Sequence, residues 1–313
     1  MAFSMHAPPS PGSGKIGVGQ KAAAVPPKVS EEHLEMVSKT DRNGVCELCR
    51  EYGELQDSHL LPKSAYKYAA SLDPQYGRSP VKIDVGAGSA GFGDTQIRIH
   101  LLCVACEQRL SRLGETPVSR LWNKHGVFPL RDQLLATQPV ANDERISIFS
   151  PGSLAPSDLY ALEFTAFSIF WRAHVWRWSR GGDPYRKALG AKYSEKIRSY
   201  LLGGDRPAGA FFFIEVDSGH LGGMFSLPVS KKVQGGRAHI FDLLGIRFTL
   251  LLGRHIGKNL VAAHTLMGES TVLTLEDFSK GRYFLDLAKA VQTKVTARGR
   301  LAGLEAREDL EPS

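Results

Sequence analysis

The pattern of apolar and polar residues divides the chain into a weakly periodic N-terminal part and a strongly periodic C-terminal part. From residue 157 to 202 apolar residues recur at spacings of three and four, which predicts two helices interrupted at Gly181–Pro184, the second covering 185–202. Glycine turns then separate short apolar runs, which predicts strands at 210–216, 224–228, 238–243, 246–252 and 259–265. A last helix is predicted over 275–295.

The N-terminal part reads as a tail followed by a small module. Residues 1–30 are rich in proline, glycine, alanine and serine, so we predict a disordered tail there, and a short helix over 31–40. One strand is predicted to end near His59–Leu61 and another to cover 96–102, with a glycine-rich loop over 73–94 between them and a helix over 108–113. A soft boundary near residue 150 gives modules of 31–150 and 151–300, and 301–313 reads as a frayed tail.

Composition and charge narrow the classes of protein to consider. The 313 residues are 42% hydrophobic and 23% charged, as in a globular protein of two domains or of one large domain with extensions. A net charge of +7 permits a polyanionic partner such as DNA without requiring one. No secretory apolar segment is seen at the start, and the longest apolar runs are too short to span a membrane, so we expect a cytoplasmic protein without a membrane partner.

The four cysteines give the strongest chemical signal. They form two C-x-x-C pairs, Cys46/Cys49 and Cys103/Cys106, and none is left over. Each pair has the spacing of a zinc knuckle, and two knuckles complete a tetrahedral Zn²⁺ site. The order of knuckle, strand, loop, strand, knuckle and helix is that of a treble clef. We therefore predict a structural zinc ion; the alternatives are four unconnected thiols or a redox pair.

Between the cysteine pairs, the chain resembles the HNH nuclease superfamily. The resemblance covers about residues 43–125 and depends on the cysteine pairs, Ser58-His59 followed by Pro62, and Glu107 after the last cysteine. The segments S-H-L-L-P-K-S-A-Y and L-L-C-V-A-C-E-Q-R-L-S are similar to those of an uncharacterised bacterial HNH-like group.

The resemblance implies a metal-dependent endonuclease that hydrolyses DNA phosphodiesters. By position, His59 would be the general base that activates water, and a Mg²⁺ or Mn²⁺ ion would contact the scissile phosphate. Glu107 would be a ligand of that ion, with Asp57 as a neighbouring acid. The sequence departs from the family where Ser58 stands in place of a metal-binding side chain. It also lacks the asparagine expected before the second strand, and Asp94, Gln96 and His100 are the polar residues nearest to that position.

Structural roles are also open for these residues. His59 is nearly as well explained by a hydrogen bond within the hairpin, and Glu107 by complementing the dipole of the helix that it begins. The incomplete ligand set favours the alternative of a catalytically inactive zinc module that binds nucleic acid or a protein. In a third interpretation, zinc supports a binding surface on the C-terminal domain.

A basic segment at 172–198 offers a candidate nucleic-acid surface. Arg172, Arg177 and Arg180 interleave with Trp176 and Trp178, so phosphates and bases are conceivable ligands. An amphipathic core helix with a solvated basic face explains the same pattern and has the greater weight. The sequence as a whole predicts an α+β fold, with an N-terminal treble-clef (ββα-metal) zinc module followed by a mixed helical and antiparallel β domain.

Overall fold

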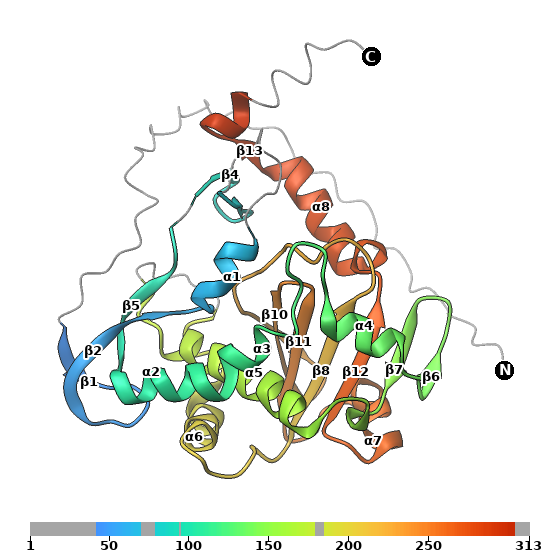
Figure 1. The fold of residues 1–313 in the computed structure, drawn as a ribbon, viewed down its shortest axis with the longest axis horizontal. Helices are drawn as coiled ribbons and strands as arrows, with labels where there is room; N and C mark the ends of the chain where they lie inside the picture. Colours follow the sequence, from blue (N-terminus) through green and yellow to red (C-terminus); the bar gives the residue numbers. More distant parts are fainter. Residues whose placement is uncertain (1–41, 70–78, 94, 179–184, 304–313) are drawn as a thin grey trace, which may run out of the picture. The chain divides into compact units, whose positions relative to one another are not determined.

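A computed structural model describes residues 42–69, 79–93, 95–178 and 185–303 of the chain. All of them belong to one compact unit that runs from Met36 to Ser313. The predicted tail over 1–30, the short helix over 31–40 and the tail beyond residue 303 lie outside the described residues. Figure 1 shows the fold: mixed helices and strands, with several separate β-sheets.

The N-terminal part begins with a three-stranded antiparallel sheet. Its strand order is β1 (Asn43–Val45), β2 (Tyr52–His59) and β5 (Arg98–Cys103). The inner face of β2 carries Leu55 and Ser58, which are buried, while Asp57 is exposed. The register shifts between Gln56 and Asp57, and such an irregularity re-aims the side chains that follow it. Both long strands lie where the sequence predicts them.

The predicted loop over 73–94 contains a hairpin in its described part. Strands β3 (Val81–Asp84) and β4 (Ser89–Phe92) pair antiparallel, and β13 (Thr296–Ala297) pairs with β4. The loop prediction is therefore wrong over this stretch. Glycines dominate the sequence signal there and hide the local β3–β4 pairing, while the third strand, β13, comes from a segment some two hundred residues later in the chain.

A nearly continuous helical segment begins directly after Cys103 and includes Cys106. It consists of α2 (Val104–Leu110), a π-helical turn at Ser111–Glu115 and α3 (Thr116–Val118). The π turn packs closely against α5. A Cβ atom added at Gly114 would come within 2.6 Å of Thr165 Oγ1 and 3.0 Å of Phe164 Cδ1. Glycine thus permits close packing at the point where the helix widens. π turns of this kind are frequent at functional sites.

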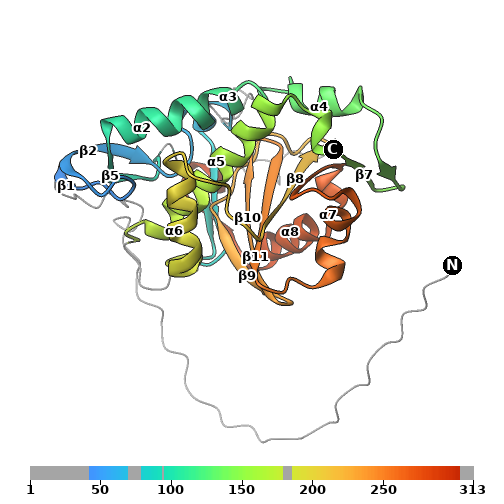
Figure 2. The same ribbon diagram turned by 90° about the horizontal axis from the view of Figure 1, so that it is seen from below.

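Helix α5 (Pro156–Val175) is buried around most of its circumference. Every residue from Ala161 to Ala173 is buried, as expected for a helix enclosed by other elements. Phe167 and Phe170 contact the large sheet through Phe212 and Phe241, with ring centroids 4.8 and 4.9 Å apart. On its other sides α5 packs against the π turn and α6 (Gly190–Leu201), as Figure 2 shows from below.

The large sheet has seven strands in the order β6-β7-β12-β8-β11-β10-β9. All neighbours are antiparallel except β12 and β8, so the sheet is mixed and not purely antiparallel as predicted. Their bounds are β6 Ala141–Asn142, β7 Ile146–Phe149, β8 Ala210–Asp217, β9 Val229–Val233, β10 Gly236–Leu243, β11 Ile246–Gly253 and β12 Thr271–Glu276.

Alternation along β8 explains how the two faces of this sheet are covered. Phe212, Ile214 and Val216 are fully buried, and Phe212 contacts α5. Phe211 and Phe213 point to the opposite face, where their rings contact His264 of α7 (Ala262–Met267). Near that face, Arg247 lies 4.3 Å from the ring centroid of Tyr283 in α8 (Arg282–Lys294). Period-two side-chain alternation therefore places helices on both faces.

Three predictions in the C-terminal part are wrong in detail. The segment 224–228 forms only an isolated bridge through Phe225, and the edge strand is β9 instead. The segment 259–265 is helical, with a 3-10 turn at Lys258–Val261 leading into α7. The predicted helix over 275–295 begins only at Arg282, because Thr271–Glu276 is strand β12.

The helical hairpin is also shorter than predicted. Helix α5 ends at Val175, before the predicted break at Gly181–Pro184, and α6 begins at Gly190. The remaining helices are short: α1 (Lys63–Tyr68) and α4 (Pro129–Leu135), with 3-10 turns at Pro151–Ser153 and Phe278–Lys280.

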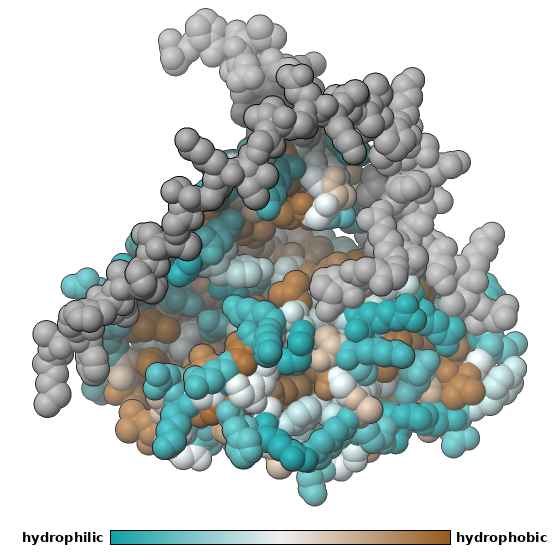
Figure 3. Space-filling view, turned by 180° about the vertical axis from the view of Figure 1, so that it is seen from behind, coloured by the Kyte–Doolittle hydropathy of each residue, from teal (hydrophilic) through white to brown (hydrophobic). Residues whose placement is uncertain are grey.

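The N-terminal and C-terminal parts share one hydrophobic core. A single cluster of buried side chains runs from Cys46 to Leu275. Strands β6 and β7 precede the boundary expected near residue 150, yet they belong to the seven-stranded sheet. Hydrophobic residues also show on the surface in Figure 3, where separate groups lie among hydrophilic side chains. Among the described helices, none has the length and apolar character needed to cross a membrane.

We expect Gly114→Ala to destabilise the protein by about 1–2 kcal/mol, because the added methyl group overpacks the contact with α5. This cost opposes the gain in helix propensity from alanine. Gly53→Ala is the matched control, since nothing lies within 4 Å of a Cβ atom at Gly53. Urea unfolding of both variants measures the difference. Equal stability of the two variants would contradict the packing argument.

Candidate functional site

The four cysteines lie together at one end of the three-stranded sheet. Cys46 and Cys49 flank the turn between β1 and β2, while Cys103 ends β5 and Cys106 lies in the first turn of α2. Their sulfur atoms all lie within 4.8 Å of one another, and the cysteines are free thiols. Cys49 Sγ and Cys103 Sγ are 3.8 Å apart. A tetrahedron with Zn–S bonds of about 2.3 Å has edges of about 3.8 Å. The cluster could therefore hold a metal ion, and thiolate donors in this geometry suit zinc.

Hydrogen bonds within the cluster favour ionised sulfur at Cys46. The Cys103 N–H donates to Cys46 Sγ at 3.3 Å. A hydrogen bond from Cys106 lowers the pKa of Cys46 to about 4, while the same interaction raises the pKa of Cys106. Four adjacent thiols cannot all lose their protons in isolation because the charges repel. A divalent cation offsets this charge repulsion by coordinating the thiolates.

Helix α6 supports the first cysteine pair from outside. Arg198 Nη1 donates to the Leu48 carbonyl at 2.6 Å, and Arg198 also binds Glu195. Glu195 receives a second hydrogen bond from Arg50, which follows the first cysteine pair. Proximity to Cys49 helps to raise the pKa of Arg198, after the hydrogen bond to Glu195. The guanidinium thus places positive charge beside the sulfur cluster and fixes the turn that carries it.

His59, the predicted base, ends β2 and is half-buried. Its imidazole hydrogen-bonds the Gln96 side chain, which precedes β5. Burial lowers the pKa of His59 below its usual value, although Gln96 and Asp57 oppose this. A neutral imidazole held by an amide can accept a proton at neutral pH. Of the polar residues considered before the second strand, Gln96 is the one that binds His59; Asp94 lies outside the described residues.

Ser58 and Glu107 meet in the interior, on the other face of β2. Ser58 is 1% exposed, and its hydroxyl accepts a hydrogen bond from the Leu102 N–H at 3.2 Å. The same hydroxyl donates to the Gln56 carbonyl at 3.3 Å and lies near the Glu107 carboxyl. Burial raises the pKa of Glu107, and its Oε1 atom is shielded from solvent without a hydrogen-bond partner. Glu107 therefore points into the protein and not into an open groove.

Asp57 lies outside this interior pair. Its carboxylate forms an exposed ion pair with Arg98 at 2.6 Å. The cysteine cluster is the only group of three or more His, Cys, Asp or Glu in the described residues that could hold a metal ion. Asp57, His59 and Glu107 are thus not brought to one cation position.

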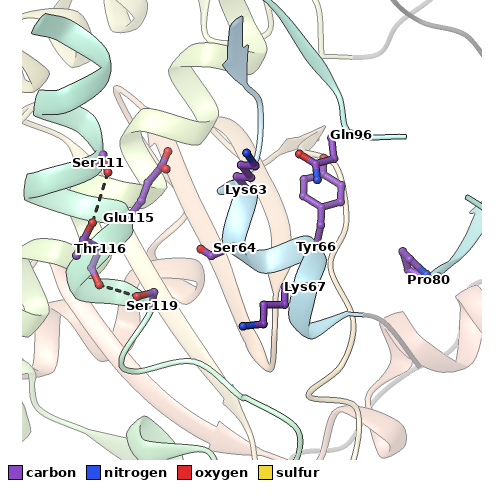
Figure 4. A pocket seen from close by; sticks show the side chains of 10 residues that line it. All are labelled: Lys63, Ser64, Tyr66, Lys67, Pro80, Gln96, Ser111, Glu115, Thr116 and Ser119. Atoms are coloured by element: carbon purple, nitrogen blue, oxygen red, sulfur yellow. Dashed lines mark hydrogen bonds between the residues drawn. The ribbon is translucent and has the colours of Figure 1, made fainter. Parts of the chain in front are cut away.

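A pocket of about 810 Å³ opens between α1 and the helical segment that holds the π turn (Figure 4). Three of its lining residues, Gln96, Lys63 and Glu115, act on the His59 imidazole. One wall is α1, with Lys63, Ser64 and Lys67, and the opposite wall is the π turn and α3. Side chains from both walls face each other across the space in Figure 4. The full lining is Lys63, Ser64, Tyr66, Lys67, Pro80, Gln96, Ser111, Glu115, Thr116 and Ser119.

The residues that line the pocket carry more positive than negative charge. Lys63 and Lys67 are exposed, and five of the lining residues have hydroxyl groups. Glu115 is the one acid among the described residues that line the pocket, and its carboxylate binds Arg172 at 2.6 Å. Ammonium and hydroxyl groups in this combination suit an anion such as a phosphate.

The structure changes the interpretation of the basic segment. Arg172 is 1% exposed and donates to the His59 carbonyl and to Glu115, so it cannot reach a nucleic acid from the surface. Arg177 is half-exposed and lies 3.5 Å from Glu47. Arg180 lies outside the described residues. Trp176 and Trp178 are buried, so their indole rings are not available to stack on bases. The prediction of a nucleic-acid surface is therefore wrong for Arg172, Trp176 and Trp178, which are buried.

Sequence reasoning missed the main parts of the pocket. Lys63 and Lys67 follow the His59 motif at helical spacing, a signal that could have placed them on one face of a short helix. Glu115 lies eight residues after Glu107, which also suggests a shared helix face. The pairing of Glu115 with Arg172 joins residues 57 positions apart, and no local pattern indicates it.

Comparison with models of known protein families, with curated proteins and with solved structures finds no match.

We expect the purified protein to bind zinc and Cys103→Ser to lose it, because one of the four sulfur donors is removed. The melting temperature should fall, since metal binding contributes to folding free energy. Val104→Ser, at the adjacent and exposed position, should retain the metal. Elemental analysis and thermal unfolding measure both effects. Full zinc content in Cys103→Ser would rule out the cluster as the metal site.

Proposed function

We propose that this protein is a zinc-stabilised nucleic-acid-binding protein whose pocket between α1 and α3 receives a backbone phosphate. The observation that carries this proposal is the pocket itself, in which Lys63 and Lys67 line one wall and the hydroxyl-bearing Ser111, Thr116 and Ser119 line the other. The zinc module is proposed to be a treble clef of HNH type. Its support is the sequence of a β1–β2 turn with two cysteines, strand β5 and helix α2 with the other two.

Charge in the segments around the pocket supports a polyanionic ligand. The segments 60–69 and 111–126 contain five lysines and arginines but only one acid, Glu115. That acid is neutralised by Arg172. Lysine contacts to phosphate supply affinity that does not depend on base sequence and that weakens with salt. The proposal therefore concerns nucleic acid in general and not a particular sequence.

The lysines should control this binding. We expect Lys63→Ala/Lys67→Ala to weaken binding of a fluorescein-labelled oligonucleotide roughly tenfold and to reduce its salt dependence by about one unit per lysine. Lys231→Ala/Lys232→Ala, on the exposed edge strand β9, removes the same charge elsewhere and should bind like the wild type. Fluorescence anisotropy at several salt concentrations measures both. If the two double variants lose equal affinity, the pocket is not the binding site.

Hydrolysis of the bound phosphodiester is a second candidate function. It is favoured by the His59–Gln96 hydrogen bond, which orients a neutral imidazole beside the pocket. A base in this position would take a proton from the attacking water. Among the described residues, Asp57, His59 and Glu107 do not form a group that could hold the divalent ion that the HNH resemblance implies, so catalytic Mg²⁺ or Mn²⁺ is not part of this proposal.

A plasmid-nicking assay tests the second candidate. We expect His59→Ala to lower the nicking rate about a hundredfold or more, because the general base is lost. Since burial lowers the pKa of His59 below 6.5, the wild-type rate should stay constant from pH 8 to about 6.5 and fall only at lower pH. Exposed His220→Ala is the control. Equal rates in wild type and His59→Ala would eliminate His59 as the base and leave the binding proposal unaffected.

A further inference from the structure

The least expected feature near the pocket is a fully buried arginine. Arg172 lies in α5, 1% exposed, within a helix whose residues from Ala161 to Ala173 are all buried. A guanidinium keeps its charge at every physiological pH, and a buried charge is costly unless it is paired. Its position therefore requires specific partners.

Arg172 has two close partners, and both belong to the site. Nη2 donates to Glu115 Oε1 and Nη1 donates to the His59 carbonyl, each at 2.6 Å. Glu115 lines the pocket and is 20% exposed, whereas Arg172 lies behind it. One side chain of α5 thus holds both the pocket wall and the end of strand β2.

The pairing changes the charge that the pocket presents. Without Arg172, a carboxylate at Glu115 would face the lysine-bearing wall and repel an anion; a unit charge a few ångströms away matters strongly in a partly buried site. With Arg172 behind it, the pair is neutral and the charge of Lys63 and Lys67 remains for the ligand.

We propose that Arg172 is a positioning residue of the pocket, whose buried guanidinium neutralises Glu115 and fixes the His59 backbone so that a phosphate binds without a divalent ion. The identity of the ligand rests on the proposed function. The neutralisation of Glu115 by Arg172 is a property of the protein alone and can be tested without a ligand. Arginine suits the role better than lysine because its planar fork reaches two acceptors in fixed directions.

The effect on His59 provides a test that needs no ligand. Charged groups that act on the His59 imidazole are Asp57 and Glu115, which raise its pKa, and Lys63, which lowers it. Removing Arg172 leaves Glu115 uncompensated. We therefore expect the pKa of His59 to rise in Arg172→Met and to return toward its wild-type value in Arg172→Met/Glu115→Gln. NMR titration measures it, with His59→Ala identifying the resonance.

Binding of the labelled oligonucleotide in magnesium-free buffer gives the second readout. We expect Arg172→Met to bind roughly tenfold more weakly and the double variant to recover most of that loss. Arg237→Met, at an exposed position on β10, should bind like the wild type. Added MgCl₂ should not tighten wild-type binding. Zinc content and thermal unfolding verify that each variant is folded.

The outcomes separate this inference from the proposed function. If the double variant stays as weak as Arg172→Met and the pKa of His59 does not move, Arg172 only stabilises the fold and the inference is overturned. Strong tightening by Mg²⁺ would also overturn it. If the wild type binds no oligonucleotide, the proposed function fails, and the His59 titration still decides the role of Arg172.

Arg172→Met removes the buried partner of Glu115, and the variant could fail to fold for that reason. In that case Glu115→Gln is measured alone, because Arg172 then keeps its charge without a carboxylate to neutralise. We expect the pKa of His59 to fall and oligonucleotide binding to become several-fold tighter. If neither quantity changes, Glu115 and Arg172 do not set the charge of the pocket.

Discussion

Enclosure of α5 on nearly all sides is the constraint on which the rest of the structure depends. Its aromatic residues pack on the seven-stranded sheet, while the face around Thr165 and Arg172 receives the π turn. Burial of this much apolar surface is the main source of stability for such an arrangement. The cysteine-bearing part and the large sheet are therefore two sides of one core, and one wall of the pocket is the π turn that packs on α5.

Two kinds of stabilisation meet at the pocket. Toward the cysteines, four sulfur atoms suited to a metal link the β1–β2 turn to β5 and α2. Toward α5, buried aromatic rings and a buried ion pair hold the structure together. His59 lies between these regions, so its backbone is set by Arg172 while its side chain is set by Gln96.

The sequence alone correctly predicted those elements whose signal lies within a short stretch of the chain. Two C-x-x-C pairs define their own geometry, and the strands that carry His59 and Cys103 follow from short apolar alternation. Strand β12 was missed because both of its faces are buried, which removes the alternation and leaves a run that resembles the start of the following helix. The ion pair of Glu115 and Arg172, like the pairing of β13 with β4, depends on tertiary packing that no short window of sequence contains.

The order of strands in the large sheet has a consequence for synthesis on the ribosome. All four cysteines have been synthesised once residue 106 is added, so a metal can be captured before the large sheet is complete. Strand β7, in contrast, pairs within the sheet only with β6 and with β12, which is made more than a hundred residues later. In the same way, the aromatic face of α5 lacks its partners Phe212 and Phe241 until β8 and β10 have been made. Nascent chains of this protein thus pass through a stage in which chaperone binding competes with aggregation.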